Sequence, residues 1–515
     1  MPPSDYIHTR ELSQQPTNST EQYFSKVVDS HPYFPNLLVT ASDVTSVKHA
    51  ALVLVYSSLL LGLCNNNDTN NNNNDSYDQH IKNKLNEFFD SKGLPESSSS
   101  SSVGAIMNQL SCTKVTGGIT NALFRVSGFQ SVLPLLVDDT TNNNANAAAR
   151  LLDFDSVLVR IFGAEGMIDR DIETSTYAAL CNADIAYRYM GRFANGRIEG
   201  WLDGYHPLQS QDLNDENVSL EIAKEMARLH CLFQVPEGEL RDHHCGPSSS
   251  DLDVISVGLW DQLSSWMEQA KGYTDFKTVE DTERVRLLQL DKIEMEVKTI
   301  IQSFTSQGGE QVEEGNDSGD STASICGSSS NKQPNVVFCH NDLLPANIMR
   351  NKATGHIQLI DFEYGGSNYA AFDMANHFNE YAGGTTAKEN GVPDYTRFPN
   401  PERQTKFCVE YVKMTKRLES MRSDITDRAD YDAAVGGNNN GQKEEMVIEE
   451  DEGIMNEALQ LLSHVQKFIL VNHLYWGLWA VNQAAEEGCE EFDYLTYASN
   501  RFNEYYVKKS EWEKK

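Results

Sequence analysis

The chain has 515 residues with 75 acidic and 42 basic side chains, a formal net charge of −33, and 39% of its residues are hydrophobic. This charge disfavours nucleic-acid binding, which needs a basic surface, and steering toward an anionic membrane. Any polyanionic substrate therefore needs a locally positive or metal-bearing pocket. Nine cysteines without a Cys-x-x-Cys pair are typical of a reducing compartment, and the chain starts without a signal-peptide pattern. We expect a cytoplasmic protein.

Residues 1–110 are predicted to form an N-terminal extension with one apolar helix. The apolar run from Ala50 to Leu63 has 14 residues. Because about 20 residues are needed to span a bilayer, we favour a buried helix over a membrane segment. Five polar, low-complexity segments cannot bury enough apolar surface to offset their ordering entropy, and we interpret them as disordered insertions or linkers. They are residues 65–75, 97–102, 140–149, 306–333 and 423–453.

The remaining blocks change in character along the chain. Residues 111–202 contain short β-rich runs separated by glycine, which predict a small antiparallel sheet, followed by a helix from Asp169 to about Asn182. Residues 203–508 are mainly helical, with apolar side chains at i, i+4, i+7 and i+11 within 220–233 and a long apolar-periodic helix over 454–487. Short strands are expected at VVFC and IQLID. The order of elements predicts an α+β fold with a cleft between two lobes.

The motif with the clearest chemistry is VVFCHNDLLPANIMRN, followed by IQLIDFEYGG. Its D-x-x-x-x-N spacing and the later D-F-x match the catalytic and metal loops of kinases. Asp342 is predicted to be the base that orients the attacking hydroxyl, and Asn347 and Asp361 are predicted to bind Mg²⁺. The alternative, polar residues that merely cap strands, does not account for two correctly ordered motifs.

A glycine pair before the apolar run ALFRV predicts a phosphate-binding loop, although by itself such a pair is more often a hairpin turn. Arg160, in the next strand, has the position of the basic residue that contacts the α- and β-phosphates in kinases, and Glu173 is placed to pair with it. An ordinary surface ion pair is the alternative for these two residues. The predicted phosphate loop comprises Gly117, Gly118, Ile119, Thr120 and Asn121.

Together these motifs resemble the choline/ethanolamine kinase family, over about residues 110–305 and 334–508. The matching stretches are GGITN, LVRIFG, EIAKEMARLH, FCHNDLLPANIM, LIDFEYGGSNYAAFDMANHFNEYAG and LYWGLWAVNQA, and generic kinases lack the last two. The resemblance implies a protein-kinase-like two-lobed fold, with a small β-rich N-lobe and a large helical C-lobe, that uses ATP and Mg²⁺. It also implies phosphorylation of ethanolamine, the first step of phosphatidylethanolamine synthesis by the CDP-ethanolamine route.

The run NHFNEYAG followed by PDYTRFP is similar to the ethanolamine branch of the family, because choline kinases usually carry Cys and Trp where this chain has Asn379 and Tyr381. An ammonium group is attracted to aromatic faces, and ethanolammonium has N–H donors that choline lacks, so acceptors can discriminate the two. Without the resemblance, tryptophans at i, i+3 spacing would be interpreted as core packing. The resemblance implies an amine pocket formed by Asp342, Tyr364, Glu380, Trp476, Trp479 and Tyr497.

The resemblance assigns Gly200, Trp201 and Leu202 to the linker that meets the adenine. The family commonly has Gln or Glu where this chain has Gly200, so base recognition would depend on backbone groups. His230 and His377 are expected to be hydrogen-bonded structural residues rather than metal ligands. The alternatives are a choline kinase, a dual kinase and a catalytically silent scaffold. The expected partner is a small-molecule amine, and the sequence leaves monomer and homodimer open.

Overall fold

The computed structural model describes residue 28 and residues 31–65, 102–115, 121–132, 154–163, 170–233, 258–305, 335–386, 388–424 and 452–514. The five predicted insertions lie almost entirely outside these ranges. The chain forms two compact units, one comprising Met1–His206 and Asn351–Glu363 and the other Pro207–Arg350 and Tyr364–Lys515. The division falls within β7 (Tyr205–Pro207) and at the end of β9 (Ile348–Asn351), close to the predicted boundary after residue 202.

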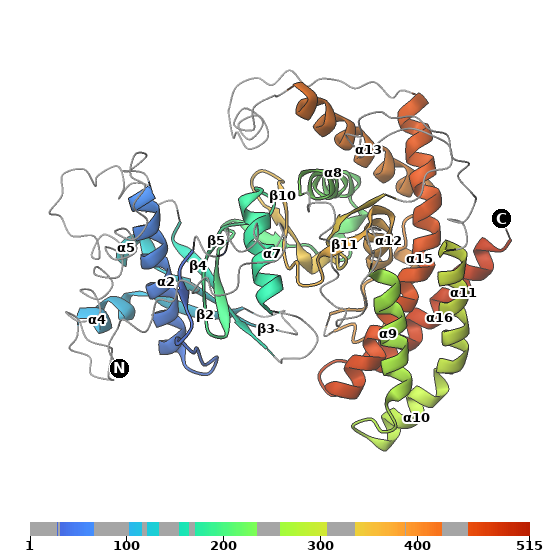
Figure 1. Ribbon diagram of the computed structural model, residues 1–515, viewed down its shortest axis with the longest axis horizontal. Helices are drawn as coiled ribbons and strands as arrows, with labels where there is room; N and C mark the ends of the chain where they lie inside the picture. The colour runs from blue at the N-terminus through green and yellow to red at the C-terminus, as the bar shows by residue number, and fades with distance from the viewer. Residues whose placement is uncertain are drawn as a thin grey trace, which may run out of the picture. The chain divides into compact units, whose positions relative to one another are not determined.

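A six-stranded sheet forms the centre of the first unit, in the order β1-β5-β6-β4-β3-β2 (Figure 1). All neighbours are antiparallel except β1 and β5, which are parallel. In β4, the β-branched side chains of Val157, Val159 and Ile161 alternate along the strand and enter the core. The strands are β1 (Tyr33–Phe34), β2 (Ser111–Val115), β3 (Asn121–Ser127), β4 (Ser156–Phe162), β5 (Tyr189–Phe193) and β6 (Gly196–Gly200).

The apolar run near the N-terminus forms helix α2 (Val44–Asn65), which packs on this sheet (Figure 1). Its residues from Ala50 to Tyr56 are buried in the same cluster as β4 and β6. The prediction of a buried helix is therefore confirmed for this stretch. Within the described ranges, no helix is long and apolar enough to cross a membrane. The other helices of this unit are α4 (Ser102–Gln109), α5 (Phe129–Val132) and α7 (Arg170–Asn182).

Helices dominate the second unit, where α8 packs against α13 and α15 packs against α12, α13 and α16. In α8, the predicted apolar face is buried through Ile222, Met226 and Leu229, and Asp215 caps the helix by accepting a hydrogen bond from Asn217 N. The helices are α8 (Glu216–Leu232), α9 (Leu259–Gly272), α10 (Val279–Leu287), α11 (Leu290–Thr305), α12 (Ala370–Glu380), α13 (Pro401–Asp424), α15 (Glu452–Glu486) and α16 (Tyr494–Trp512), with 3₁₀ turns η3 (Asp212–Asn214), η5 (Pro345–Asn347) and η6 (Tyr395–Arg397).

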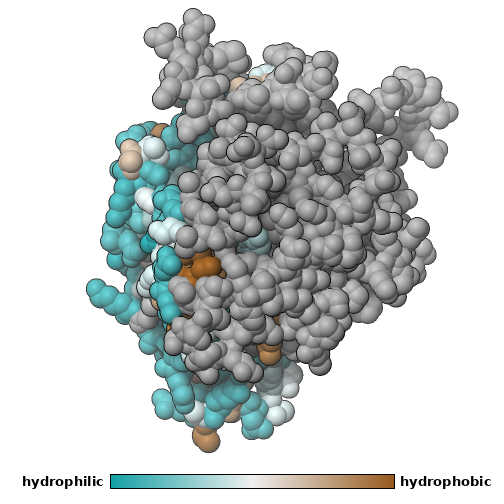
Figure 2. Space-filling view, turned by 90° about the vertical axis from the view of Figure 1, so that its left-hand side faces the viewer, coloured by the Kyte–Doolittle hydropathy of each residue, from teal (hydrophilic) through white to brown (hydrophobic). Residues whose placement is uncertain are grey.

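A short antiparallel ribbon carries the predicted catalytic motif. β8 (Val336–Cys339) pairs with β11 (Gly366–Tyr369), and β11 leads directly into α12. In this register Cys339 lies opposite Gly366, and the loop that begins at His340 reaches α12 through the side chain of Asp373. Strands were predicted at VVFC and IQLID, and they are present as β8 and β10 (Ile357–Leu359). Where described residues are visible in Figure 2, they are mainly hydrophilic, with hydrophobic side chains in small groups.

Candidate active site

Two side chains of α12 accept hydrogen bonds from the backbone of the loop that carries Asp342. The backbone N–H groups of His340 and Asn341 each donate to a different carboxylate oxygen of Asp373, at 2.8 Å. The N–H of Leu343 donates to Oδ1 of Asn376 at 2.7 Å. Because a carboxylate that accepts two backbone N–H groups fixes both peptide planes, the main chain on each side of Asp342 has a defined orientation.

The turn before Asp342 needs a left-handed residue. Asn341 has φ of +65°, a conformation that asparagine tolerates better than most side chains. Its amide stabilises the turn from the other side, since Nδ2 donates to the carbonyl of Tyr364 at 2.8 Å and Oδ1 accepts from Asn368 at 2.9 Å. Both Asn341 and Asn368 are buried. This network links the loop to β11.

Asp342 and Asn347, five residues apart in sequence, lie side by side. The Asn347 amide nitrogen donates to the carboxylate of Asp342 at 3.0 Å and to its carbonyl at 2.9 Å. The 3₁₀ turn η5, which starts with Pro345, brings the chain back to make these contacts. Because the Asn347 amide nitrogen makes these hydrogen bonds, its amide oxygen is the atom that could bind a metal ion. Oxygen is the type of ligand that Mg²⁺ prefers.

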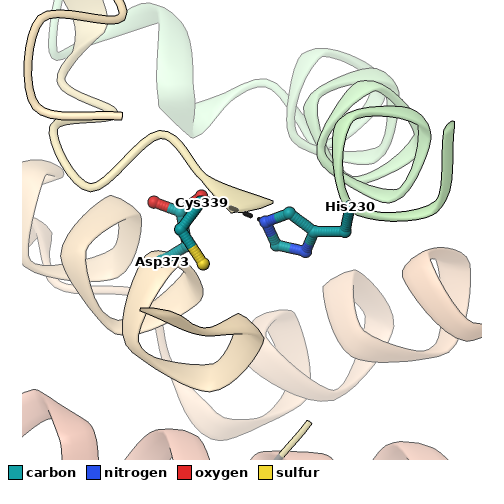
Figure 3. A group of neighbouring side chains, drawn as sticks. All are labelled: His230, Cys339 and Asp373. Atoms are coloured by element: carbon teal, nitrogen blue, oxygen red, sulfur yellow. Dashed lines mark hydrogen bonds and ion pairs between the residues drawn. The ribbon is translucent and has the colours of Figure 1, made fainter. Parts of the chain in front are cut away.

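Asp373 also belongs to a buried group with His230 and Cys339, whose ligand-type atoms lie within 4.8 Å of one another (Figure 3). His230 contacts Oδ2 of Asp373 through Nε2 at 3.1 Å and the hydroxyl of Tyr411 through Nδ1 at 3.0 Å. Burial and the charge of Asp373 raise the pKa of the Cys339 thiol well above its ordinary value. Both oxygens of Asp373 already accept backbone N–H groups, so the group is a hydrogen-bonded support for the loop.

The expected hydrogen bonds of the two structural histidines are present. In addition to the contacts of His230, Nδ1 of His377 lies 3.2 Å from the carbonyl of Leu343. Burial lowers the pKa of His377 to about 4, so its ring is neutral at physiological pH. A neutral ring next to a carbonyl donates through Nδ1, which gives the loop that carries Asp342 a further contact with α12.

In the first unit, Arg160 belongs to a buried network of ion pairs. Its Nε donates to Glu199 at 2.7 Å and its Nη1 to Asp361 at 3.1 Å. Glu199 also accepts from Nε of Arg197 at 2.7 Å. Burial by itself would raise the pKa of Glu199, but the two guanidinium groups lower it to about 2. Because Arg160 is only 3% exposed, the alternative of an ordinary surface ion pair is excluded.

Glu173 joins this network through other partners than the predicted one. Its ion pairs are to Nη1 of Arg197 and Nη1 of Arg170, both at 2.8 Å. Arg160 affects Glu173 through its charge, which helps to lower the pKa of the carboxyl group against the opposing effect of burial. The physical reason is the sheet register, in which Arg160 on β4 lies directly opposite Arg197 on β6. Two like charges in this position need a carboxylate between them, and Glu199 provides it.

The predicted phosphate loop is described only at its last residue. Gly117, Gly118, Ile119 and Thr120 lie outside the described residues, whereas Asn121 begins β3 and is buried. Nδ2 of Asn121 donates to Glu363 at 3.4 Å. Asp361 lies two residues before Glu363 in the sequence. It has a φ of +64°, and its side chain is 24% exposed.

The predicted adenine linker begins at Gly200, the last residue of β6. The N–H of Gly200 donates to the carbonyl of Arg188 at 2.8 Å. A Cβ at this position would lie 2.6 Å from the ring of Tyr187, so the close approach requires glycine. Trp201 and Leu202 are half-buried, and the guanidinium of Arg125 lies 4.8 Å from the centre of the Trp201 ring.

The predicted amine-pocket aromatics form one group in the second unit. The ring of Trp476 lies 5.2 Å from that of Tyr364 and 5.3 Å from that of Trp479, in both cases edge to face. Nε1 of Trp479 donates to the hydroxyl of Tyr364 at 3.1 Å. Since Trp479 is half-buried while Trp476 is 4% exposed, only part of this group is ordinary core packing.

Tyr497 connects the predicted base with the predicted amine-binding carboxylate. Burial raises its pKa well above the ordinary value, Arg501 opposes this, and the negative charges of Glu380 and Asp342 raise it further. Both carboxylates therefore lie within electrostatic reach of one phenol. Glu380 is 2% exposed and pairs with Arg501 at 3.2 Å. Direct contacts join Asp342 with Asn347, and Tyr364 with Trp476 and Trp479, in the second unit. Glu380 and Tyr497 belong to the same unit, and Arg160, Glu173 and Asp361 belong to the first.

Sequence reasoning missed five residues that hold the predicted ones: Asp373, Asn376, Glu199, Arg197 and Arg501. For the first two, the available signal was the composition of α12, because every residue of this helix is buried and yet it contains Asp, Asn, His and Glu. Buried polar groups need partners, so such a helix has to make specific hydrogen bonds. No comparable signal marks Arg501, whose partners come from other helices.

The site has two features that are typical of kinase-like phosphotransferases. One is a D-x-x-x-x-N loop whose backbone is hydrogen-bonded to α12, and the other is a buried arginine paired with the aspartate of a D-F-E motif. A family model described as choline/ethanolamine kinase matches residues 112–506. Probable choline kinase 3 of Arabidopsis thaliana is 27% identical over 355 residues, which cover 68% of this chain and 78% of the relative. Ethanolamine kinase 1 of Mus musculus is 28% identical over 386 residues, 74% of this chain and 84% of the relative.

Among solved structures, an ethanolamine kinase of Plasmodium vivax shares the fold, with a TM-score of 0.52 and 22% identity over 84% of this chain and 90% of that one. The protein-kinase-like α+β fold expected from the sequence is therefore confirmed. The chain belongs to the choline/ethanolamine kinase family and is a phosphotransferase of that family.

Proposed function

We propose that this protein phosphorylates the hydroxyl of ethanolamine with ATP and yields phosphoethanolamine. The observation that carries the proposal is that the Asp342 carboxylate, which accepts a hydrogen bond from Asn347 at 3.0 Å, belongs to the same unit as the buried carboxylate of Glu380. Ethanolamine has a hydroxyl and an ammonium separated by two carbons. A base for one end and a carboxylate for the other suit a short amino alcohol.

In the proposed reaction Asp342 accepts a hydrogen bond from the substrate hydroxyl and takes its proton as the oxygen attacks the γ-phosphorus, while the bond from this phosphorus to the bridging oxygen breaks and ADP leaves. The hydrogen bond from Asn347 orients the Asp342 carboxylate. The oxygen ligands of Asn347 and Asp361 fit Mg²⁺ in type, and they would hold the metal, which supplies neutralisation of the phosphate charge. Arg160, positioned by Glu199, would contact the phosphates of ATP, and the linker Gly200–Leu202 would meet its adenine.

One feature supports a primary amine at the other end, and a second supports a cation of either kind. Glu380 offers acceptor oxygens, which an ammonium with N–H donors can use and a quaternary ammonium cannot. The aromatic faces of Trp476, Trp479 and Tyr364 attract either cation. These rings also favour a second candidate, choline, and a relative named as a probable choline kinase has similar identity to this chain.

The test is a kinase assay on the full chain with ethanolamine and choline at equal concentrations, with and without Mg²⁺. We expect Mg²⁺-dependent phosphorylation with ethanolamine preferred, and a loss of kcat of about 10³-fold or more in Asp342→Ala with ATP binding retained. Preference for choline would transfer the assignment to the second candidate. Wild-type turnover in Asp342→Ala would remove Asp342 as the base.

A further inference from the structure

A buried arginine joins three helices next to the proposed amine site. Arg501, on α16, has a side chain that is 3% exposed. Its Nη1 donates to Oε1 of Glu380, the last residue of α12, at 3.2 Å. Its Nη2 donates to Oδ1 of Asn472, in the middle of α15, at 2.6 Å and to the carbonyl of the same residue at 3.3 Å. The position of Glu380 is therefore set by contacts that come from two other helices.

The ion pair occupies one oxygen of Glu380 and leaves the other unused. Among the residues that the structure describes, the buried Oε2 of Glu380 has no hydrogen-bond partner. The neighbouring Asn379 contacts the same oxygen as Arg501, because its amide nitrogen donates to Oδ1 of Asn472 at 2.8 Å. A buried carboxylate oxygen without a partner is unfavourable unless a ligand completes its hydrogen bonds. An N–H donor on the substrate would do so.

The charge of Glu380 also depends on Arg501. Burial raises the pKa of Glu380, and the positive charge and hydrogen bond of Arg501 oppose this rise. In the part of the chain that the structure describes, the three other groups whose charges affect that of Glu380 cannot replace that effect, since each is an acid. They are Glu389, Tyr395 and Tyr497. Without Arg501 the carboxyl group would take up a proton more readily and lose its strength as an acceptor.

We propose that Arg501 is a positioning residue for substrate specificity, which holds Glu380 ionised with Oε2 free and so favours a primary ammonium over a quaternary one. This inference rests on the proposed function. A primary ammonium would form a charge-assisted N–H···O bond to Oε2, whereas choline has no N–H to donate. Arg501 itself repels any cation, so its contribution to binding comes through the geometry and charge of Glu380.

The experiment compares wild type, Arg501→Gln and Arg501→Lys for ethanolamine and choline between pH 6 and pH 9. We expect Arg501→Gln to raise the KM for ethanolamine about tenfold at pH 7, with kcat and the KM for ATP nearly unchanged and choline affected less than about threefold. The ethanolamine KM of this variant should fall as the pH rises, because Glu380 ionises again. Arg501→Lys should recover part of the wild-type value.

The control is Lys509→Gln on the same helix, which removes a cation paired with Glu296 at 2.6 Å. It should leave both amine KM values unchanged. A double-mutant cycle with Glu380→Gln isolates the coupling, since Arg501→Gln should have no further effect once Glu380 is uncharged. The double variant also has no uncompensated buried charge, so it serves if Arg501→Gln alone does not fold.

The outcomes separate the inference from the proposed function. If wild type does not phosphorylate ethanolamine, or prefers choline, both are wrong. If wild type prefers ethanolamine but Arg501→Gln keeps the same ratio of kcat/KM values for the two amines, only the role of Arg501 is wrong. An additional tenfold effect of Arg501→Gln in the Glu380→Gln background would likewise overturn the inference, because Arg501 would then act without Glu380.

Discussion

Replacement of Glu199 by Gln tests whether the ion pairs around Arg160 stabilise the fold. Glu199 is buried and accepts from both Arg160 and Arg197. Although burial favours protonation, these cations lower its pKa from 4.5 to about 2. One pKa unit corresponds to about 1.4 kcal/mol. The ionised carboxylate therefore contributes about 3 kcal/mol to the free energy of unfolding at neutral pH.

The pH dependence gives this prediction a definite sign. Because the pKa is lower in the folded state, the contribution is complete above the unfolded value of 4.5 and is lost as the pH falls toward about 2. We expect Glu199→Gln to lower the free energy of unfolding by about 3 kcal/mol at pH 7, and the difference from wild type to shrink below about pH 4.5.

Urea-induced unfolding of both proteins between pH 3.5 and pH 7.5 measures this difference. Glu283→Gln is the matched control, since its ion pair with Arg286 is exposed and should contribute nothing measurable. A Glu199→Gln difference below about 0.5 kcal/mol at pH 7, or one that is constant with pH, would refute the idea that a charged carboxylate compensates the two arginines.

Two further predictions concern the second unit. In Asp373→Asn one acceptor for the N–H groups of His340 and Asn341 is replaced by a donor. We therefore expect kcat, measured by steady-state kinetics, to fall about 10²-fold or more while the KM for ATP changes little. An unchanged kcat would show that the loop keeps its conformation without Asp373. In Gly477→Ala the added methyl group would overlap the ring of Phe502 on α16. We therefore expect the free energy of unfolding, measured by urea-induced unfolding, to fall by about 1–3 kcal/mol. An unchanged free energy of unfolding would mean that α15 and α16 move apart at this point without cost.

The contact between Asp342 and Asn347 could be predicted from sequence because it is local. Asp342 and Asn347 are five residues apart, and the 3₁₀ turn that joins them lies within the motif itself. The side chains that support the loop could not be predicted in the same way. Asp373 is about thirty residues away and acts on backbone groups, which have no residue-type signature. Only the presence of polar residues in the fully buried helix α12 indicates that such contacts exist.

The sheet of the first unit shows a similar limit. The β-branched run in β4 is enough to predict a strand, and the apolar run of α2 is enough to predict a buried helix. Neither run indicates which strand or helix lies beside it in the fold. The pairing of Arg160 with Glu199 depends on β4 lying beside β6, which follows from the folded register. The predicted pairing with Glu173 relied on order along the chain, and so it did not include the second arginine, Arg197, that the register places opposite Arg160.

The two units use the same physical arrangement for groups that are proposed to meet the substrates. Arg160 is held by Glu199, and Glu380 is held by Arg501; in each case the partner is buried and comes from a different element. An unpaired buried charge is strongly destabilising, so each pair restricts its functional member to one orientation before any ligand binds. Pre-organised charges need little rearrangement during phosphoryl transfer, which depends on positioning and charge neutralisation. The partners of the predicted residues are therefore as sensitive to substitution as the predicted residues themselves.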